Sequence, residues 1–374
     1  MPARRVRLLD LSALHAPIQG EIDAAIQAVI QSQQFILGKP VARLEETLAA
    51  YCGARHAVGC ASGSDALYLA LLALGIGAGD VVLVPAFTFF ATAGAVSRAG
   101  AVPVFVDIDP VTFNLDPAHL AATLSRQRQA KAVIAVHLFG GAADMDPILR
   151  IASQHGLTVI EDGAQAIGAE YQHRRVLSIG RIGCLSFFPT KNLGAYGDGG
   201  MLTANDDDLA HHLAALRVHG GLERYRHDWI GINSRLDALQ AAVLLAKTPY
   251  LDGWTLARQQ NAARYQSLLA DARLPVVPPR PAPYQTRHIF NQYVIRCQRR
   301  DELKQHLERC GIGTEVYYPI PLHLQPCYRE LGYRAGDLPV SEEAAAAVLA
   351  LPVHPALGPG DVDYVSQCLA AFYR

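Results

Sequence analysis

Two ionisable residues, a lysine and an aspartate, each follow an apolar stretch and could together hold a reactive ring. Lys191 comes just after the apolar segment Cys184–Phe188, and Asp162 comes just after Leu157–Ile160. Burial at such a position lowers the pKa of an ammonium, and the neutral amine can attack an aldehyde. A carboxylate there can pair with a protonated pyridine nitrogen, which keeps the ring electron-withdrawing. Taken singly, each residue has a commoner role, because loop lysines are usually solvated and such an aspartate usually caps a helix.

Three further features supply the other groups that such a ring would need. Gln165 lies about one helical turn after Asp162 and could hydrogen-bond a ring hydroxyl. Segment 59–66 is rich in small residues at a loop-to-helix junction, where free backbone N–H groups and the helix dipole favour a phosphate. Segment 85–92 contains aromatic residues that could stack on a flat ring. A plain helix cap and core packing are the simpler explanations of these two segments when each is considered alone.

The elements that must position these groups follow an alternating pattern. Apolar runs alternate with helical patterns through the first two thirds of the chain, which is typical of a mainly parallel sheet with helices on both faces. Ligands of such sheets bind at the carboxyl ends of the strands. We expect strands at Val81–Val84, Val102–Val106, Ala132–Val136, Leu157–Ile160 and Cys184–Phe188. We expect helices at Asp65–Leu74, Ala91–Ala99, Pro117–Leu124 and Pro147–His155. Three of the groups follow expected strands and another begins a helix, which favours one shared site.

The last third of the chain has a different pattern, which predicts a smaller α+β domain. Its expected elements are a helix over Leu251–Leu269, a strand at Gln292–Arg296, a helix near Asp301–Cys310 and a strand at Thr314–Tyr318. We therefore expect a large α/β domain over residues 1–250 and a small domain over residues 251–374.

Composition excludes several classes of function. The chain has 374 residues, 33 basic and 34 acidic, with no basic block, so we do not expect a nucleic-acid partner. Its apolar runs are too short for a membrane span, and seven scattered cysteines favour a reducing cytoplasm. The histidines lack ligand spacing, so no metal site is expected. Glycines 75, 77 and 79 follow a helix and precede a strand, which is the wrong order for dinucleotide binding.

These motifs resemble the DegT/DnrJ/EryC1/StrS family of sugar aminotransferases, which are pyridoxal-phosphate enzymes of the aspartate-aminotransferase-like fold. The resemblance runs from about Phe35 to the C-terminus and rests on segments 62–67, 85–92, 161–165, 186–200, 233–237 and 317–323. It implies fold type I, with a large, mainly parallel seven-stranded sheet and a smaller C-terminal domain. Two positions depart from the family, Ser64 where threonine is frequent and Gly163 where alanine is usual. We expect neither change to alter the chemistry.

The resemblance also implies a role for each matching residue. Lys191 is the catalytic residue, which holds pyridoxal 5′-phosphate as a Schiff base and moves a proton between substrate and cofactor. Asp162 pairs with the pyridine nitrogen, and Asn233 reaches the phosphate from the neighbouring subunit of a homodimer. The implied cofactor contacts are Gly63, Ser64, Phe89, Asp162, Gln165, Ser186, Lys191 and Asn233. The implied substrate-side residues are Arg235, Tyr317, Tyr318 and His323.

The reaction implied by the resemblance is a ping-pong transamination. L-glutamate leaves its amino group as pyridoxamine phosphate and departs as 2-oxoglutarate, and a nucleotide-linked keto sugar then accepts the group. The sequence Lys191-Asn192-Leu193-Gly194 is more similar to members that aminate C3 than to those that aminate C4. A keto-sugar dehydratase on the same scaffold is one alternative, although such relatives replace the lysine with histidine. A non-catalytic regulator that binds the cofactor or a sugar nucleotide is another, and a nicotinamide oxidoreductase is disfavoured by the misplaced glycines.

Overall fold

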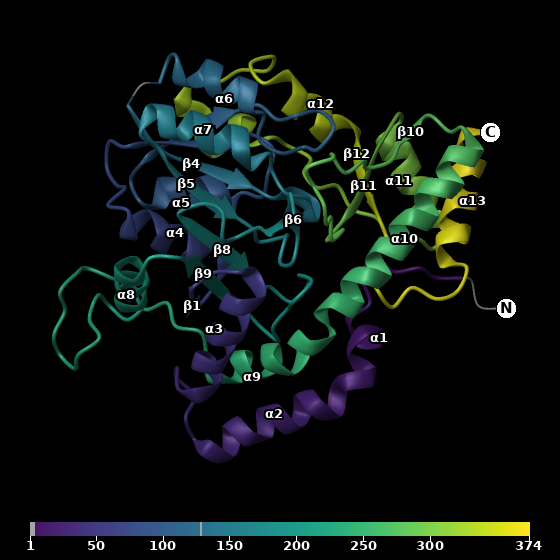
Figure 1. Cartoon of the computed structure of the whole chain (residues 1–374). Coiled ribbons are helices and arrows are strands. Elements are labelled where there is room, and N and C mark those ends of the chain that lie inside the picture. Colours follow the sequence, from purple (N-terminus) through teal and green to yellow (C-terminus); the bar gives the residue numbers. More distant parts are fainter. Residues whose placement is uncertain (1–3, 128) are drawn as a thin grey trace.

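A computed structural model describes residues 4–127 and 129–374 of the chain, and its main feature is a seven-stranded sheet (Figure 1). The strands are β1 (His56–Cys60), β2 (Val81–Pro85), β3 (Val102–Val106), β4 (Ala130–Val136), β5 (Thr158–Asp162), β8 (Ile182–Ser186) and β9 (Gly200–Ala204). Their order is β1-β9-β8-β5-β4-β2-β3. Strand β9 runs antiparallel to β1 and β8, and every other neighbouring pair is parallel. The predicted α/β fold with a mainly parallel sheet is confirmed.

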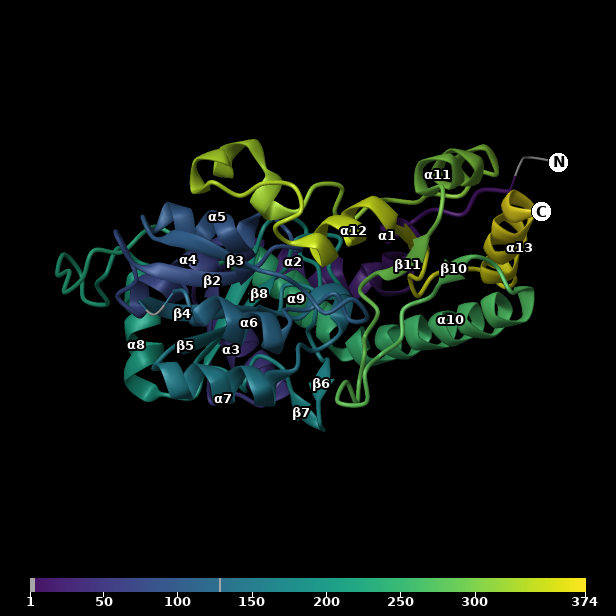
Figure 2. The same cartoon turned by 90° about the horizontal axis from the view of Figure 1, so that it is seen from above.

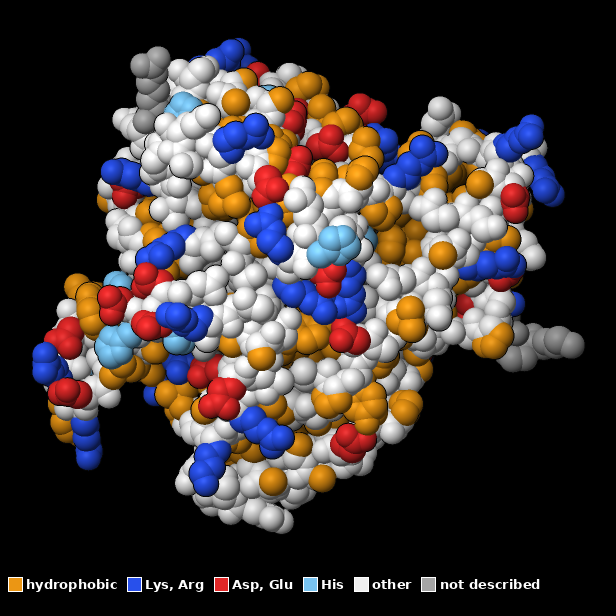
Figure 3. Space-filling view, viewed as in Figure 1, with side chains coloured by type: hydrophobic (Ala, Val, Ile, Leu, Met, Phe, Trp, Pro, Cys, Tyr) orange, Lys and Arg blue, Asp and Glu red, His pale blue; other side chains and the backbone are white. Residues whose placement is uncertain are grey.

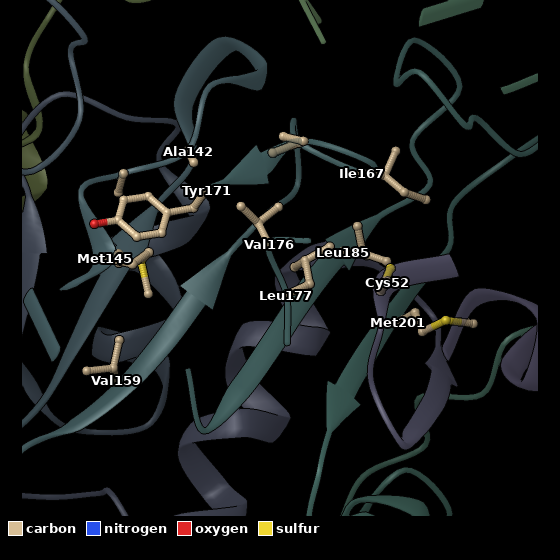
Figure 4. Close-up of a cluster of buried hydrophobic side chains, with 14 of the residues drawn as sticks. Cys52, Ala142, Met145, Val159, Ile167, Tyr171, Val176, Leu177, Leu185 and Met201 are labelled. Atoms are coloured by element: carbon tan, nitrogen blue, oxygen red, sulfur yellow. The ribbon is translucent and has the colours of Figure 1, made fainter. Parts of the chain in front are cut away.

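Helices cover both faces of this sheet, which explains why its strands are apolar throughout. Successive side chains alternate between two cores, as Val133 lies in one and Ile134 in the other. One core is lined by α3 (Lys39–Cys52), α6 (Pro117–Leu124), α7 (Met145–His155) and α9 (Ala238–Lys247). The other is lined by α4 (Gly63–Ala73), α5 (Ala91–Arg98) and α8 (Asp207–Leu216). Figure 4 shows part of the first core, which contains Val159, Leu185 and Met201 of β5, β8 and β9 and also Tyr171 of the short pair β6 (Glu170–Tyr171) and β7 (Arg174–Arg175).

A second, three-stranded sheet lies to one side of the first (Figure 2). It consists of the antiparallel strands β10 (Val276–Val277), β11 (Tyr293–Cys297) and β12 (Val348–Leu351). A separate core joins it to α10 (Leu251–Ala272), α11 (Arg300–Arg309) and α13 (Asp361–Tyr373). Near the N-terminus, Val6 enters this core and bridges to Ile312. We propose a domain boundary at residue 250, between α9 and α10.

The remaining helices include α1 (Leu11–His15), α2 (Gln19–Ser32) and α12 (Pro339–Ala347). Helix α2 packs beside α9 at the lower edge of Figure 1. Within the described residues, no helix combines the length and the apolar character that a bilayer crossing requires.

Most of the expected elements are present, but two predictions need correction. Helix α4 begins at Gly63, earlier than the predicted start at Asp65, because Ser62 caps it by accepting a hydrogen bond from the Asp65 N–H at 3.0 Å. The strand predicted at Thr314–Tyr318 is wrong. Only Glu315 makes a bridge there, to Ala350, and the chain then leaves the sheet to carry Tyr318 toward the larger domain.

Candidate active site

The residues expected to do chemistry gather at one edge of the main sheet. Because β1, β2, β5 and β8 run in the same direction, their carboxyl ends share this edge. Helix α4 follows β1, the aromatic segment follows β2, Asp162 ends β5, and the loop that carries Lys191 follows β8. The topology therefore brings together four segments that are up to 130 residues apart, as the sequence predicted.

Lys191 lies on the loop that joins β8 to β9. The loop is folded tightly on itself, because the Lys191 N–H donates to the Phe188 carbonyl at 2.8 Å and a side chain at Gly194 would come within 2.3 Å of the Pro189 carbonyl oxygen. Burial lowers the pKa of the Lys191 ammonium, and the negative charge of Asp162 opposes that effect only in part. A larger fraction of the amine is consequently neutral and nucleophilic than for a lysine in water.

Asp162 is a buried carboxylate with few protein partners. Its Oδ2 accepts a hydrogen bond from the Thr92 hydroxyl at 2.8 Å, and its Oδ1 accepts one from the Ala164 N–H at 3.2 Å. Burial raises the pKa of Asp162, and these two donors and the charge of Lys191 reduce but do not cancel the effect. The charges of Asp162 and Lys191 thus influence each other, which is the proximity that a shared ligand requires.

Gln165 and Phe89 lie near this carboxylate. The Gln165 Oε1 accepts from the Phe139 N–H at 2.8 Å, and its Nε2 donates to the Tyr318 hydroxyl at 2.9 Å. Phe89 is 55% exposed, although its ring centroid lies 6.0 Å from that of Tyr318. Its carbonyl accepts from the N–H of Thr92, the residue that holds Asp162. An exposed aromatic face beside a buried carboxylate is suited to a flat cationic ring.

The start of α4 forms the third part of the site. A side chain at Gly63 would come within 2.6 Å of the Ser186 Cβ, so only glycine permits this close approach. The N–H groups of Gly63 and Ser64 belong to the first helical turn, where no intrahelical acceptor exists. Together with the Ser186 hydroxyl they can bind an anion, and the helix dipole adds favourable potential.

The residues predicted to reach the site from a partner subunit or from the substrate side lie outside the three parts just described. Asn233 is exposed and bridges to Val218 through its backbone. Arg235 has a buried Nε without a hydrogen-bond partner among the described residues. Tyr317 is half-buried beside Tyr318, with ring centroids 5.8 Å apart.

His323 does not reach the surface of the site in this structure. It is 1% exposed, its Nε2 lies 3.1 Å from Glu342, and its ring packs near Tyr333. The substrate-side role of His323 stays a prediction, and in this structure the enclosed side chain supports the segment before it. Its position in a family motif does not by itself indicate contact with a ligand.

Sequence reasoning missed a hydrogen-bonded network behind Asp162. His137, the residue after β4, lies 2.9 Å through its Nε2 from a carboxylate oxygen of Glu161. The His137 Nδ1 accepts from the Ala143 N–H, and the backbone N–H of His137 donates to the Asp162 carbonyl. The adjacent acids at the end of an apolar strand were the available signal, since a buried glutamate needs a partner.

A cofactor with a cationic ring, an aldehyde and a phosphate would find a matching group in this site for each of its three parts. Among the described residues, Asp162 is a buried carboxylate without an ion-pair partner, which a protonated ring nitrogen would supply. Gly63 and Ser64 offer unpaired N–H groups, and Lys191 offers an amine with a lowered pKa. The residues fit such a group. No cluster of three or more metal-ligating side chains occurs in residues 4–127 and 129–374.

Comparisons with known proteins point to one family. The sequence profile of the DegT/DnrJ/EryC1/StrS aminotransferase family matches residues 17–370. A protein of Geobacillus stearothermophilus named pleiotropic regulatory protein is 51% identical over 99% of both chains. UDP-2-acetamido-2-deoxy-3-oxo-D-glucuronate aminotransferase of Pseudomonas aeruginosa is 41% identical over 97% of this chain and 99% of its own. The crystal structure of S. venezuelae DesV in complex with a ketimine intermediate superposes with a TM-score of 0.95, at 41% identity over 99% of both chains.

Proposed function

The chain belongs to the DegT/DnrJ/EryC1/StrS aminotransferase family, and from this premise we propose that it transfers an amino group from L-glutamate to C3 of a nucleotide-diphosphate keto sugar. The family consists of enzymes that depend on pyridoxal phosphate, and several relatives of this chain are named as aminotransferases of nucleotide-linked sugars. The observation that carries the proposal is the pair of Lys191 and Asp162, whose charges interact across one site at the edge of the sheet. The product would be an amino sugar for a glycan, a lipopolysaccharide or an antibiotic.

Each part of the cofactor has a matching group in the chain. Lys191 would hold the aldehyde carbon, Asp162 the pyridine nitrogen and Gln165 the ring hydroxyl, while Phe89 would lie over the ring. Gly63, Ser64 and Ser186 would hold the phosphate. When bound, pyridoxal phosphate withdraws electrons from the carbon that bears the amino group, which makes a proton on that carbon acidic.

The chain's own residues supply the proton transfer and the orientation. Lys191 Nζ, whose pKa is lowered by burial, takes the proton from the donor and returns it to the sugar carbon. The Thr92 hydroxyl keeps Asp162 oriented while its charge is in use. Arg235, whose Nε has no hydrogen-bond partner in the part of the chain that the structure describes, is our candidate for the carboxylate of glutamate, since a guanidinium matches that group. Tyr317 and Tyr318 are candidates for the sugar side.

The preference for C3 rests on two observations. The segment Lys191–Gly194 is similar to that of C3-aminating members. The Pseudomonas aeruginosa relative carries a 3-oxo sugar in its name. A panel of nucleotide-linked 3-keto and 4-keto sugars, each incubated with glutamate and examined by mass spectrometry, tests the preference. Amination of 4-keto sugars alone would contradict it.

We further propose a homodimer with shared active sites, located in the cytoplasm, where seven free thiols stay reduced. The connection after α8 projects from the body of the molecule, on the left of Figures 1 and 3. It ends next to Asn233, and it exposes the large apolar residues Leu222, Tyr225, Trp229 and Ile230. Tyr225 and Ile230 are 84% and 95% exposed, which a partner subunit would relieve.

Mixing two inactive variants tests the shared site. We expect Lys191→Ala and Asn233→Ala each to lack activity as pure proteins. In a mixed dimer, one site combines Lys191 of the Asn233→Ala subunit with Asn233 of the Lys191→Ala subunit, and the other site lacks both residues. Random mixing makes about half of the dimers mixed, so about a quarter of all sites become active. Recovery of no activity, or full activity of Asn233→Ala alone, would contradict the shared site.

One relative favours a second function, because its name is that of a regulatory protein. Incubation of the protein with pyridoxal phosphate and glutamate alone separates the two. Formation of 2-oxoglutarate supports the aminotransferase, and Lys191→Ala should abolish it together with the lysine-linked absorbance. A protein that binds the cofactor but converts neither glutamate nor any keto sugar would instead be a regulator. A dehydratase would release water from the sugar without gaining nitrogen.

A further inference from the structure

Helix α9 contains a buried cation that lies against the loop of Lys191. Lys247 is 0% exposed, and its Nζ donates a hydrogen bond to the carbonyl of Gly194 at 2.7 Å. The same Nζ lies 4.3 Å from the centroid of the Tyr196 ring. Within the described residues no carboxylate forms an ion pair with it. Both groups that stabilise this charge therefore belong to the loop between β8 and β9.

A second residue of α9 holds the same loop. The Gln240 Oε1 accepts a hydrogen bond from the Tyr196 N–H at 2.8 Å. Residues 240 and 247 are seven apart, which is close to two helical turns, so both lie on one face of the helix. The two contacts fix the backbone of the loop at Gly194 and at Tyr196.

The held segment cannot move independently of Lys191. Gly194 packs directly on Pro189, with no room for a side chain, and Lys191 lies in the turn between them. Just before α9, Ser234 donates to Asp65 at 2.8 Å and accepts from the Ala61 N–H at 3.1 Å, next to the start of α4. Helix α9 and its leading segment thus connect the phosphate end of the site with the lysine end.

The fixed loop also forms one wall of a cleft of about 690 Å³. Pro189, Ala195 and Tyr196 line one side, and residues of α1 and α2 line the other. His15 packs its ring 5.5 Å from that of Tyr196. A displaced loop would change the shape of this cleft as well as the position of the amine.

An apolar side chain at position 247 would be easier to bury. An ammonium without an ionised partner costs free energy in a protein interior, and burial lowers the pKa of Lys247 to about 8. Helix α9 is otherwise apolar on its buried face, as Ala241 and Leu244 show. A charge retained at this cost indicates a role beyond packing.

We propose that Lys247 and Gln240 are positioning residues that hold the loop of Lys191, and thereby keep its amine buried beside Asp162. The inference rests on the proposed role of Lys191 as the reactive amine. It assigns to α9 the task of placing that amine before any ligand is bound.

The test measures Lys191 in the cofactor-free protein and does not need turnover. Pyridoxal condenses with an amine with loss of water, and borohydride reduces the resulting C=N bond to a stable secondary amine. Peptide mass spectrometry then gives the rate of labelling at Lys191 as a function of pH. Hydrogen–deuterium exchange over residues 187–199 reports the mobility of the loop in the same samples.

We expect Lys247→Met to increase deuterium uptake over residues 187–199 and to raise the pH midpoint of Lys191 labelling, because a released amine is better solvated. Labelling at neutral pH falls about tenfold for each unit of that rise. Gln240→Leu should have the same effect, and Lys247→Arg should restore part of the wild-type behaviour, since it keeps a charged donor. Lys131→Met, which removes an exposed lysine, is the matched control and should behave as the wild type.

Unchanged uptake and an unchanged midpoint in folded Lys247→Met would overturn the inference. If that variant does not fold, the same result in Gln240→Leu overturns it. A failure of the proposed function is distinguishable, because wild-type Lys191 would then show no preferential labelling. If Lys191 is labelled preferentially in the wild type and equally in both variants, the proposed function stands and the positioning role of Lys247 and Gln240 is refuted.

Discussion

Two carboxylates stand side by side at the end of β5 and have opposite surroundings. Glu161 is fully buried, but it accepts hydrogen bonds from the N–H groups of Leu177, Ile179 and Gly180 and lies 2.9 Å from His137. Burial alone would raise the pKa of Glu161, and these partners outweigh it and leave the pKa below its ordinary value. Asp162 has two donors, and burial leaves the pKa of that carboxyl raised.

The difference indicates that Glu161 stabilises the fold, whereas the adjacent Asp162 is available to bind a ligand. Removing one partner from a fully paired buried charge is destabilising, whereas a buried charge with too few partners already costs free energy in the folded chain. The missing partner of Asp162 is what a ligand can supply. Neighbouring residues on a strand point to opposite faces, so the two environments can differ although the backbone positions are adjacent.

The largest expected effect comes from neutralising the incompletely paired carboxylate. We expect Asp162→Asn to reduce transamination by about 10²–10³-fold, because loss of one member of a buried hydrogen-bonded charge pair costs about 2–5 kcal/mol. The cofactor-free variant should be at least as stable as the wild type at pH 7, as a buried charge has been removed. Steady-state kinetics and urea denaturation give the two values. A strongly destabilised apoprotein would show that Asp162 is structural and would erase the contrast with Glu161.

The neighbouring substitution should have the reverse effect. We expect Glu161→Gln to lower the free energy of unfolding by about 3–5 kcal/mol at pH 7, since it breaks a buried pair. The folded pKa of Glu161 is lowered, so its contribution is present above the ordinary value of 4.5 and is lost as the pH falls through the folded value. Urea denaturation of the cofactor-free wild type and variant, from pH 7 to well below pH 4.5, would measure both. Equal stability of variant and wild type at pH 7 would refute this account of the network.

A smaller effect is expected from the hydroxyl that orients Asp162. Thr92→Val keeps the shape of the side chain and removes its hydrogen bond to Oδ2. A bond to a charged group contributes about 1.5–3 kcal/mol, so we expect roughly a tenfold loss of kcat with little change in the fold. Thr88→Val is the matched control, because the Thr88 hydroxyl lies 3.3 Å from that of Thr92 and, within the described structure, does not hydrogen-bond Asp162 itself. Equal losses in the two variants would assign the effect to packing.

The smallest effect concerns pH. The folded, cofactor-free chain binds the Asp162 proton more tightly than the unfolded chain, because the folded pKa is raised. This stabilisation is present below the ordinary value of 3.8 and is lost as the pH rises through the folded value. Relative to Asp162→Asn, the wild type should lose about 1.4 kcal/mol for each unit of the raised pKa. Denaturation at several pH values, with and without pyridoxal phosphate, tests this, and a difference independent of pH would contradict it.

The sequence was sufficient for the parts of the site that depend on local pattern. Apolar strands followed by Asp162 and Lys191 could be recognised from the order of residues alone. The network of His137 could not, because its partner is 24 residues away and the contact depends on the register that places Val136 beside Asp162. Sequence also misjudged Thr314–Tyr318, whose β-forming residues are drawn away from the sheet by the contact of Tyr318 with Gln165.

The same limit applies to α9. Its buried face appears apolar in the sequence, and nothing local distinguishes Lys247 from a lysine whose charge reaches solvent. Only the tertiary contact with Gly194 reveals that the charge is enclosed. Likewise, His323 lies in a recognisable motif, but its depth below the surface is set by Tyr333 and Glu342 from elsewhere in the chain.

The pairing of Ser186 with Gly200 has a consequence for how the enzyme could acquire new substrates. This pairing holds the two ends of the loop that carries Lys191 next to each other, so the loop is closed by the sheet at its base. The Gln240 side chain of α9 also lies against Gly197, so only residues inserted after Gly197 would lie beyond the α9 contacts. The entropic cost of a longer loop grows only slowly with its length. A library of loop lengths at that point could thus reshape the neighbouring cleft while the amine stays in place.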